Sequence, residues 1–196
     1  MKLGVITDEV SQDIWEAAGF ARHFGLDALE LRSVNDRGPF AWTREDAEEI
    51  KRAADEYGLA IAAISSPLFK CNIDDEAAVA EHINGFRRCA EHAKYLGCSL
   101  IRGFDFWRCG ASVAERAGKF TEIAKICAEY RVYCVLENEP ATHGGSPAEV
   151  LELVRAISSP WKIMSKIVDR SNCRKPKTDK KNQELLRMEA VPGFLW

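Results

Sequence analysis

The sequence lacks most of the short motifs that mark metal or nucleotide sites. It contains seven cysteines but no CxxC pair, and neither HExxH nor HxxxH occurs, so residue spacing gives no zinc signature. No GxGxxG follows the first apolar run, which disfavours a dinucleotide-binding sheet. No run of about 18 apolar residues is present, so we predict no membrane-spanning helix. The first residues reach an acid at Asp8, too early for a signal peptide, and we expect a cytoplasmic protein.

The composition is that of an ordinary globular chain. Its 196 residues are 46% hydrophobic, and 30 acidic against 27 basic side chains leave a net charge of −3. This length predicts one domain with a core of useful size, and this charge gives no general attraction to nucleic acid. We expect the cysteines to be reduced thiols that pack as small apolar side chains, with a catalytic cysteine as the alternative.

Short apolar runs alternate with amphipathic stretches over the first 157 residues. The runs predict strands, and apolar residues at three-to-four spacing predict helices. The expected strands cover 3–6, 28–31, 60–64, 100–104 and 132–136, and the expected helices cover 11–24, 43–57, 76–96, 112–127 and 146–157. Five successive units imply a parallel sheet with right-handed crossovers, either closed as an eightfold barrel or open and doubly wound.

The expected helices also carry signals at their ends. Capping-box spacing or a capping serine before proline predicts where three helices begin, at Thr43/Asp46, Ser112/Glu115 and Ser146/Pro147. Three glycines follow directly after expected helices, where glycine accepts a left-handed backbone, at positions 25, 58 and 97. The corresponding joint after the fourth helix, Tyr130-Arg131-Val132, has no glycine.

The pattern changes near residue 161. Residues 162–196 hold nine basic and four acidic side chains and show no apolar periodicity. We therefore divide the chain into a barrel-like portion, 1–161, and a divergent or disordered basic tail, 162–196, with a nucleic-acid-binding arm as the alternative for the tail. An eightfold barrel needs about 250 residues, so we expect an incomplete barrel of five to six units. Its bare edges, at the first and fifth strands, are places that a homo-oligomer could cover.

Polar side chains follow each expected strand, at the end where parallel α/β proteins place their functional groups. Glu137-Asn138-Glu139 directly follows a buried apolar strand, and a carboxylate there must be paired, bound to metal or protonated. Oxygen ligands suit magnesium or manganese, and adding imidazole admits zinc. We therefore expect metal or substrate contact at this sequence, with a structural ion pair between Glu137 and Arg102 as the alternative.

Other strand ends provide further candidates for a binding site. Glu30 and Arg32 are two residues apart on a strand and share a face, so they are expected either to contact substrate or to satisfy each other. Lys70 and Arg102 together could hold an anionic group such as a phosphate. Asp8 and His143 are weaker candidates, since ordinary loop positions explain them as well.

Several of these segments, in this order, resemble one family. The segments are Val5-Ile6-Thr7-Asp8-Glu9-Val10-Ser11, Leu29-Glu30-Leu31-Arg32, Ile101-Arg102-Gly103-Phe104 and Leu136-Glu137-Asn138-Glu139. Over about residues 1–157 the chain resembles the sugar phosphate isomerase/epimerase family, a xylose-isomerase-like TIM barrel related to endonuclease IV.

The resemblance implies a divalent metal (manganese, magnesium or zinc) held by a set of ligands that includes Glu137. It also makes Glu137 one of two glutamates that move a proton. Asp169, in Asp169-Arg170-Ser171-Asn172, matches part of the family's sixth-strand ligand motif but lacks its proline. The sequence offers no counterpart for the ligands of strands seven and eight.

The function implied is isomerisation or epimerisation of a sugar, sugar phosphate or polyol by metal-assisted proton transfer beside a carbonyl. The expected partner is a small carbohydrate, with Glu30, Arg32, Lys70, Arg102, Asn138 and Glu139 contacting it. A non-catalytic barrel remnant that needs a partner chain is the alternative from a different class. An AP-endonuclease-like hydrolase is disfavoured, because tracking phosphates requires a basic groove and residues 1–161 are acidic on balance.

Overall fold

A computed structural model describes residues 2–157 and 163–166. The strands are β1 (Gly4–Ile6), β2 (Ala28–Leu31), β3 (Ala60–Leu68), β4 (Leu100–Gly103), β5 (Tyr133–Glu137) and β6 (Ile163–Lys166). The helices are the 3-10 turn η1 (Thr7–Glu9), α1 (Ile14–His23), α2 (Arg44–Tyr57), α3 (Glu76–Leu96), α4 (Val113–Tyr130) and α5 (Pro147–Ala156). No described helix is long and apolar enough to cross a membrane.

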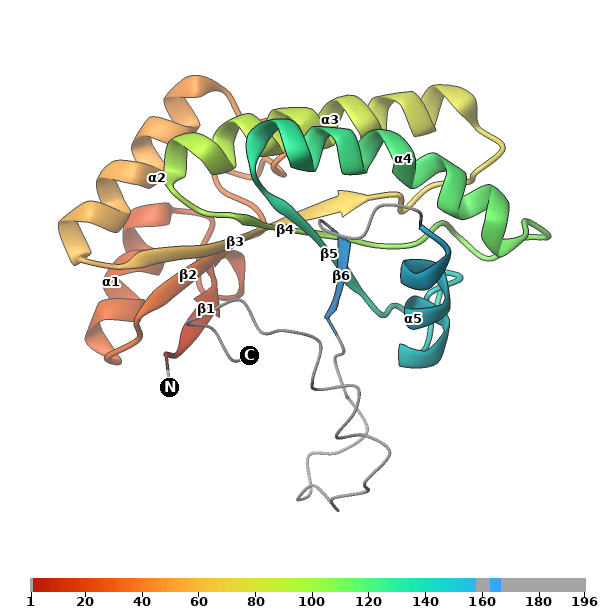
Figure 1. Ribbon diagram of the computed structural model, residues 1–196. Helices are drawn as coiled ribbons and strands as arrows, with labels where there is room; N and C mark the ends of the chain where they lie inside the picture. The colour runs from red at the N-terminus through yellow and green to blue at the C-terminus, as the bar shows by residue number, and fades with distance from the viewer. Residues whose placement is uncertain (1, 158–162, 167–196) are drawn as a thin grey trace, which may run out of the picture.

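The strands form one parallel sheet in chain order, β1-β2-β3-β4-β5-β6, with a helix in each connection (Figure 1). Each helix packs against the next one along the chain, and α2, α3 and α4 lie along one side of the sheet (Figure 1). A sheet in which every strand neighbours its predecessor in sequence is the arrangement of a TIM barrel rather than of a doubly wound sheet. The expected fold class, an incomplete α/β barrel, is confirmed.

The helix boundaries follow from the capping residues. Both predicted capping boxes are formed, at Thr43/Asp46 and Ser112/Glu115, and Ser146 caps α5 with Pro147 in its first turn. The helix α1 begins three residues later than predicted, because the carboxylate of Asp13 accepts from two backbone N–H groups and so fixes the start at Ile14.

The strand β3 is longer than predicted. The predicted strand ends at residue 64, where the apolar run stops before Ser65-Ser66-Pro67. In the structure this segment stays paired with β4 through Ser65↔Arg102 and, after a register shift, Leu68↔Gly103. Pairing with a neighbouring strand thus overrides local preference, and it places Ser65 inside the sheet beside Arg102.

The strand β6 lies in the segment that the sequence analysis assigned to the tail. Its backbone pairs in parallel with β5, from Cys134↔Ile163 to Glu137↔Lys166. The expectation that the fifth strand would be a bare edge is therefore wrong; in the described part of the chain the outer strands are β1 and β6. The sequence of β6, Ile163-Met164-Ser165-Lys166, has only two apolar residues and lies in a basic stretch, so only the hydrogen bonds to β5 reveal it.

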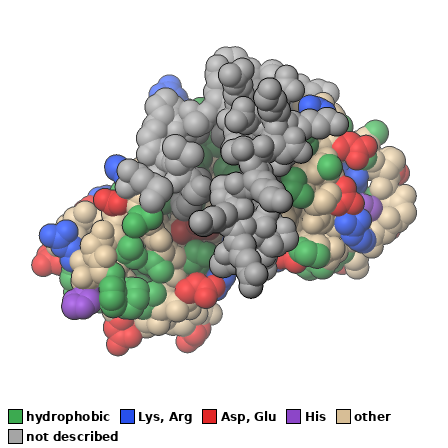
Figure 2. Space-filling view, turned by 90° about the horizontal axis from the view of Figure 1, so that it is seen from below, with side chains coloured by type: hydrophobic (Ala, Val, Ile, Leu, Met, Phe, Trp, Pro, Cys, Tyr) green, Lys and Arg blue, Asp and Glu red, His purple; other side chains and the backbone are tan. Residues whose placement is uncertain are grey.

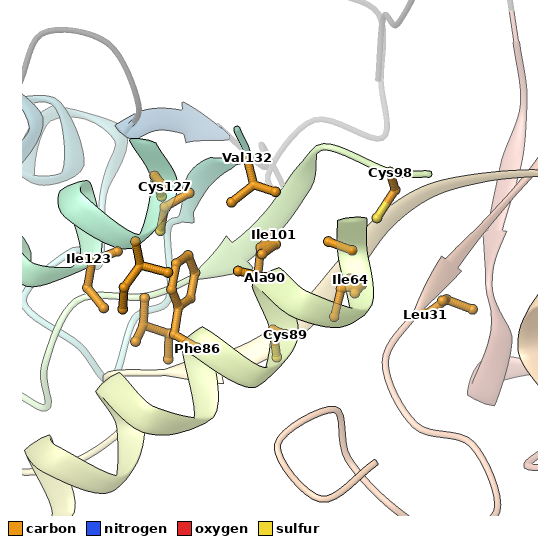
Figure 3. Packing of buried hydrophobic residues seen from close by; sticks show 14 of the residues in the cluster. Leu31, Ile64, Phe86, Cys89, Ala90, Cys98, Ile101, Ile123, Cys127 and Val132 are labelled. Carbon is orange, nitrogen blue, oxygen red and sulfur yellow. The ribbon is translucent and has the colours of Figure 1, made fainter. Parts of the chain in front are cut away.

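The core fills the space between the sheet and the helices. Figure 3 shows side chains from α3, α4 and the strands meeting there, among them Phe86, Ile101 and Ile123. Five cysteines are buried free thiols, as expected, at positions 71, 89, 98, 127 and 134. Burial raises the pKa of Cys71 to about 11 and that of Cys98 to about 12. Cys109 is the exception because it is exposed, and Cys173 lies outside the described residues.

Arg131 occupies the joint where the expected glycine is missing. Its φ is +59°, in the same left-handed region as Gly58 at +65° and Gly97 at +77°. We predict that Arg131→Gly raises the free energy of unfolding by about 0.5–1 kcal/mol, because relief of the Cβ strain outweighs the added entropy of the unfolded chain. Chemical denaturation measures this change. Gly58→Arg is the matched control and should lower stability; a destabilised Arg131→Gly variant would contradict the argument.

Candidate functional site

Three of the predicted site residues, Glu30, Arg102 and Glu137, lie on the face of the sheet that points away from the helices. Leu29, Ile64 and Ile101 belong to the core beneath the helices. Because side chains alternate along a strand, their neighbours Glu30, Ser65 and Arg102 lie on the opposite face. The same alternation places Glu137 there, two residues beyond Val135 of β5. These groups stand near the carboxyl ends of the strands, where parallel sheets place their functional side chains.

Glu137 and Arg102 form a buried ion pair. Arg102 Nη1 lies 3.6 Å from Glu137 Oε2, and the two side chains are only 11% and 8% exposed. Burial lowers the pKa of Arg102, opposed by the negative charges of Glu137, Glu30 and Asp8. The 3.6 Å separation exceeds hydrogen-bond length, so the contact is electrostatic. The ion pair that was the alternative for Glu137 is thus present in the structure. The carboxylate is buried beside the guanidinium group of Arg102 and does not point into solvent.

Glu30 and Arg32 have different partners. The hydroxyl of Ser65 donates to Glu30 Oε1 in a buried hydrogen bond, and Glu30 is 4% exposed. Arg32 follows β2 directly and donates from Nε to Asp8 Oδ2 and from Nη2 to Glu9 Oε1, both at 2.9 Å. Arg32 therefore fixes the turn after β1, while Glu30 stays close enough to Arg102 to influence its pKa.

Lys70 and Arg102 converge on one aromatic ring. Lys70 Nζ lies 4.0 Å from the centroid of Phe104 and Arg102 Cζ lies 4.9 Å from it. Lys70 also pairs with Glu139 at 3.3 Å, with side-chain exposures of 30% and 25%. The structure therefore brings the two predicted cations together, each beside a carboxylate of the Glu137-Asn138-Glu139 segment. Sequence reasoning missed Phe104, although its position two residues after Arg102 placed it on the same side of the chain.

The connections that follow β4 and β5 hold groups that the sequence only partly indicated. Asp105 and Arg116 form a buried pair, with side chains 1% and 7% exposed. Asp105 was visible as a strand-end acid, but Arg116 was not, because it lies on a helix eleven residues later. His143 contacts Cys109 rather than the groups around Glu137, with 3.4 Å between Nε2 and Sγ. The weaker expectation of a role for His143 beside Glu137 therefore receives no support from its position.

The described residues do not form a metal site by themselves. No group of three or more His, Cys, Asp or Glu side chains within 2–157 is arranged to hold a metal ion. Glu137 supplies one carboxylate, and the Oε2 atom of this carboxylate faces Arg102. Asp169, the second predicted ligand, lies outside the described residues. A complete ligand set therefore needs donors beyond those that the structure describes.

The visible surface shows no basic groove. On the face in Figure 2, Lys and Arg side chains are interspersed with Asp and Glu side chains in the described parts. Many of the cations are held in ion pairs, such as Arg87 with Glu122 and Glu129. A protein that tracks a phosphate backbone needs an uncompensated stripe of positive charge.

A match to a known protein family identifies the family of the chain. The sequence model of the xylose isomerase-like TIM barrel matches residues 18–166. The chain belongs to this family. No curated protein sequence is similar enough to the chain to count as a match.

Solved structures share the family's fold. A 3-keto-D-glucoside 4-epimerase from E. coli is 13% identical with a TM-score of 0.68, over 87% of this chain and 71% of its own. A probable 3-DHS dehydratase from Bacillus anthracis is 22% identical with a TM-score of 0.67, over 85% and 62%. A D-allulose 3-epimerase from Methylomonas sp. is 18% identical with a TM-score of 0.68, over 85% and 62%. The chain thus spans about two thirds of the length of these three proteins, in agreement with an incomplete barrel.

Proposed function

We propose that the chain is a divalent-metal-assisted isomerase or epimerase that acts on a sugar, sugar phosphate or polyol. The observation that carries this proposal is the buried Glu137 carboxylate at the end of β5, held opposite Arg102 on the face of the sheet that points away from the helices. Similar structures support the reaction class, since they include sugar epimerases, one crystallised with D-allulose and one with D-fructose. Others contain magnesium or zinc, which supports a divalent metal.

Glu137 is the proposed catalytic residue. Its carboxylate removes the proton from the carbon beside the substrate carbonyl, a step to which a positioned base contributes about 10²–10⁴ in rate. A divalent metal would polarise the carbonyl oxygen when bound, and Glu137 and Asp169 are proposed to be among the residues that would hold it. Arg102 Nη1 faces the same carboxylate at 3.6 Å, so its guanidinium group is proposed to donate to an oxygen of a substrate bound at Glu137.

The remaining predicted residues are proposed to position the substrate. Glu30, Arg32, Asn138 and Glu139 are proposed to contact substrate hydroxyl groups, which their polar atoms suit. Lys70 already pairs with Glu139, so a substrate phosphate would have to replace Glu139 at Lys70. This pair is partly exposed, which makes such an exchange possible without unfolding the site.

Two measurements test the proposal. Titration calorimetry with manganese chloride should show saturable binding, and proton NMR in D2O should show exchange at the carbon beside the carbonyl of a ketose such as D-fructose. Exchange should require manganese, because a bound metal would polarise the carbonyl and so acidify this proton. Folded protein that neither binds manganese nor promotes exchange with a panel of ketoses would refute the proposal.

A non-catalytic barrel that needs a second chain is the other candidate. The observation that favours it is the sheet itself, because in the described part of the chain β1 and β6 each pair with one strand only. Exposed outer strands present unpaired backbone groups that another chain can cover. Light scattering coupled to size-exclusion chromatography would show a dimer or larger assembly if a second copy does so, and a stable monomer would exclude that form of the candidate.

A further inference from the structure

Cys109 differs from every other cysteine that the structure describes. The other five are buried in the core, whereas Cys109 is exposed in the connection between β4 and α4. Its Sγ lies 3.4 Å from Nε2 of His143, which belongs to the connection between β5 and α5. A thiol and an imidazole at this distance are a nucleophile with an adjacent base.

The backbone holds this pair in place. The two connections are joined by an antiparallel bridge at Trp107↔Thr142. The N–H of His143 donates to the carbonyl of Phe106 at 2.9 Å. Arg108, next to Cys109, donates from both Nη atoms to Glu149 of α5 at 3.0–3.1 Å. The short distance between Cys109 Sγ and His143 Nε2 is therefore set by two connections that backbone hydrogen bonds hold together.

The hydrogen bonds identify the free nitrogen of the imidazole. The backbone N–H of Cys109 donates to His143 Nε2 at 3.0 Å, so Nε2 carries the lone pair and Nδ1 the proton. Burial, Arg116 and Arg108 all lower the pKa of His143, while Glu149 raises it. The imidazole is consequently neutral at pH 7 and can accept a proton.

The surroundings of the sulfur favour a negative charge. The N–H of Ala111 donates to Cys109 Sγ at 3.5 Å. Ala111 directly precedes Ser112, the N-cap of the 18-residue helix α4, whose N-terminal end attracts anions. The positive end of this helix therefore lies beside the sulfur, and an imidazolium forms next to it when His143 accepts the thiol proton.

We propose that Cys109 is a reactive thiol, activated by His143, that undergoes exchange with small disulfides. His143 Nε2 accepts the thiol proton and gives up its hydrogen bond from the backbone N–H of Cys109. The thiolate attacks one sulfur of a low-molecular-weight disulfide, so that a new S–S bond forms as the old one breaks. The leaving thiolate takes the proton from His143. Cys109 is oxidised to a mixed disulfide, and the departing half of the reagent is reduced to a thiol.

The experiment uses the full chain with Cys173→Ser, so that only the six cysteines that the structure describes remain. The probe is 5,5′-dithiobis(2-nitrobenzoic acid), a disulfide whose released thiolate is coloured, at pH 7 with folded protein. We expect one thiol per chain to react in a fast phase, which mass spectrometry assigns to the peptide containing Cys109 and which Cys109→Ser abolishes. His143→Gln should slow this phase at least about tenfold, and His23→Gln, at an exposed histidine of α1, should not.

The pH profile separates activation from a merely structural role. The fast phase of the parent should persist to lower pH than that of His143→Gln, because only the parent has an imidazole beside the sulfur to accept the thiol proton. A fast phase that survives Cys109→Ser, or a His143→Gln variant with the parent's rate and profile, would overturn the proposal. Should His143→Gln not fold, the parent is compared with itself in guanidinium chloride; Cys109 must react faster in the folded chain, and equal or slower reaction would also overturn it.

Discussion

Proton exchange at the carbon beside a ketose carbonyl is expected to fall by about 10³ when Glu137 is replaced by glutamine, within the range of 10²–10⁴ for a positioned base. Glutamine keeps the size of the side chain but cannot accept the proton. The same change removes a carboxylate from the proposed metal ligands, so manganese affinity should fall as well. Exchange rates come from NMR in D2O, and affinities come from calorimetry.

A control variant distinguishes this effect from general loss of charge. Glu152→Gln removes an exposed carboxylate on α5, away from Arg102, and should leave both the exchange rate and the manganese affinity unchanged. Circular dichroism and thermal melting check that Glu137→Gln remains folded, which matters because Arg102 loses a buried anionic partner. If folded Glu137→Gln exchanged the substrate proton at the parent's rate, Glu137 would not be the base.

Arg116→Met should lower the free energy of unfolding at pH 7 by about 3–5 kcal/mol, the cost of leaving a buried charge without its partner. Arg116 Nη1 binds Asp105 Oδ2, and both side chains are almost wholly buried. Asp105 also accepts a hydrogen bond from the N–H of Phe106 at 2.8 Å. This bond holds the carboxylate in its buried position, where its negative charge needs a cationic partner. Denaturant titration followed by circular dichroism measures the loss.

The loss of unfolding free energy caused by Arg116→Met should become smaller as the pH falls. Burial already raises the pKa of Asp105 in the folded protein, with Arg116 opposing the rise. A carboxyl group with a raised folded pKa binds its proton more readily in the folded than in the unfolded chain, so its stability contribution is present at low pH and is lost as pH rises through that pKa. Removing Arg116 raises the pKa further, and acid then neutralises the stranded carboxylate.

Two variants provide the comparison. The double variant Asp105→Asn with Arg116→Met removes both charges and should recover most of the lost stability. Arg44→Met breaks an exposed pair with Glu48 on α2 and should leave the unfolding midpoint nearly unchanged. A loss for Arg116→Met that is equal at pH 5 and pH 8 would show that packing of the arginine chain, not its charge, is what matters.

The segments that could be read from the sequence are those governed by local rules. Capping residues at Thr43, Ser112 and Ser146 fixed helix starts, because the backbone N–H groups they satisfy lie within three residues of them. The strand at 60–68 was read too short and the strand at 163–166 was not read at all, since both depend on hydrogen bonds to a neighbouring strand rather than on their own composition.

The candidate site shows the same division. The sequence placed Glu137, Arg102, Glu30 and Lys70 at strand ends, and parallel topology then required them to lie on one edge of the sheet. Which carboxylate meets which cation was open, because alternation gives a face but no distance. The structure pairs Glu137 with Arg102 and Lys70 with Glu139. Their roles in binding and catalysis stay predictions.

By itself the sequence determined the order of strands and helices, the family resemblance and the charged residues that end each strand, since these follow from periodicity, capping and spacing along the chain. Only the tertiary structure decided that β6 continues the sheet, that Arg116 reaches Asp105 and that His143 faces Cys109 instead of Glu137. Each of these contacts joins residues from different units of the fold, and distances between units are set by packing rather than by sequence separation.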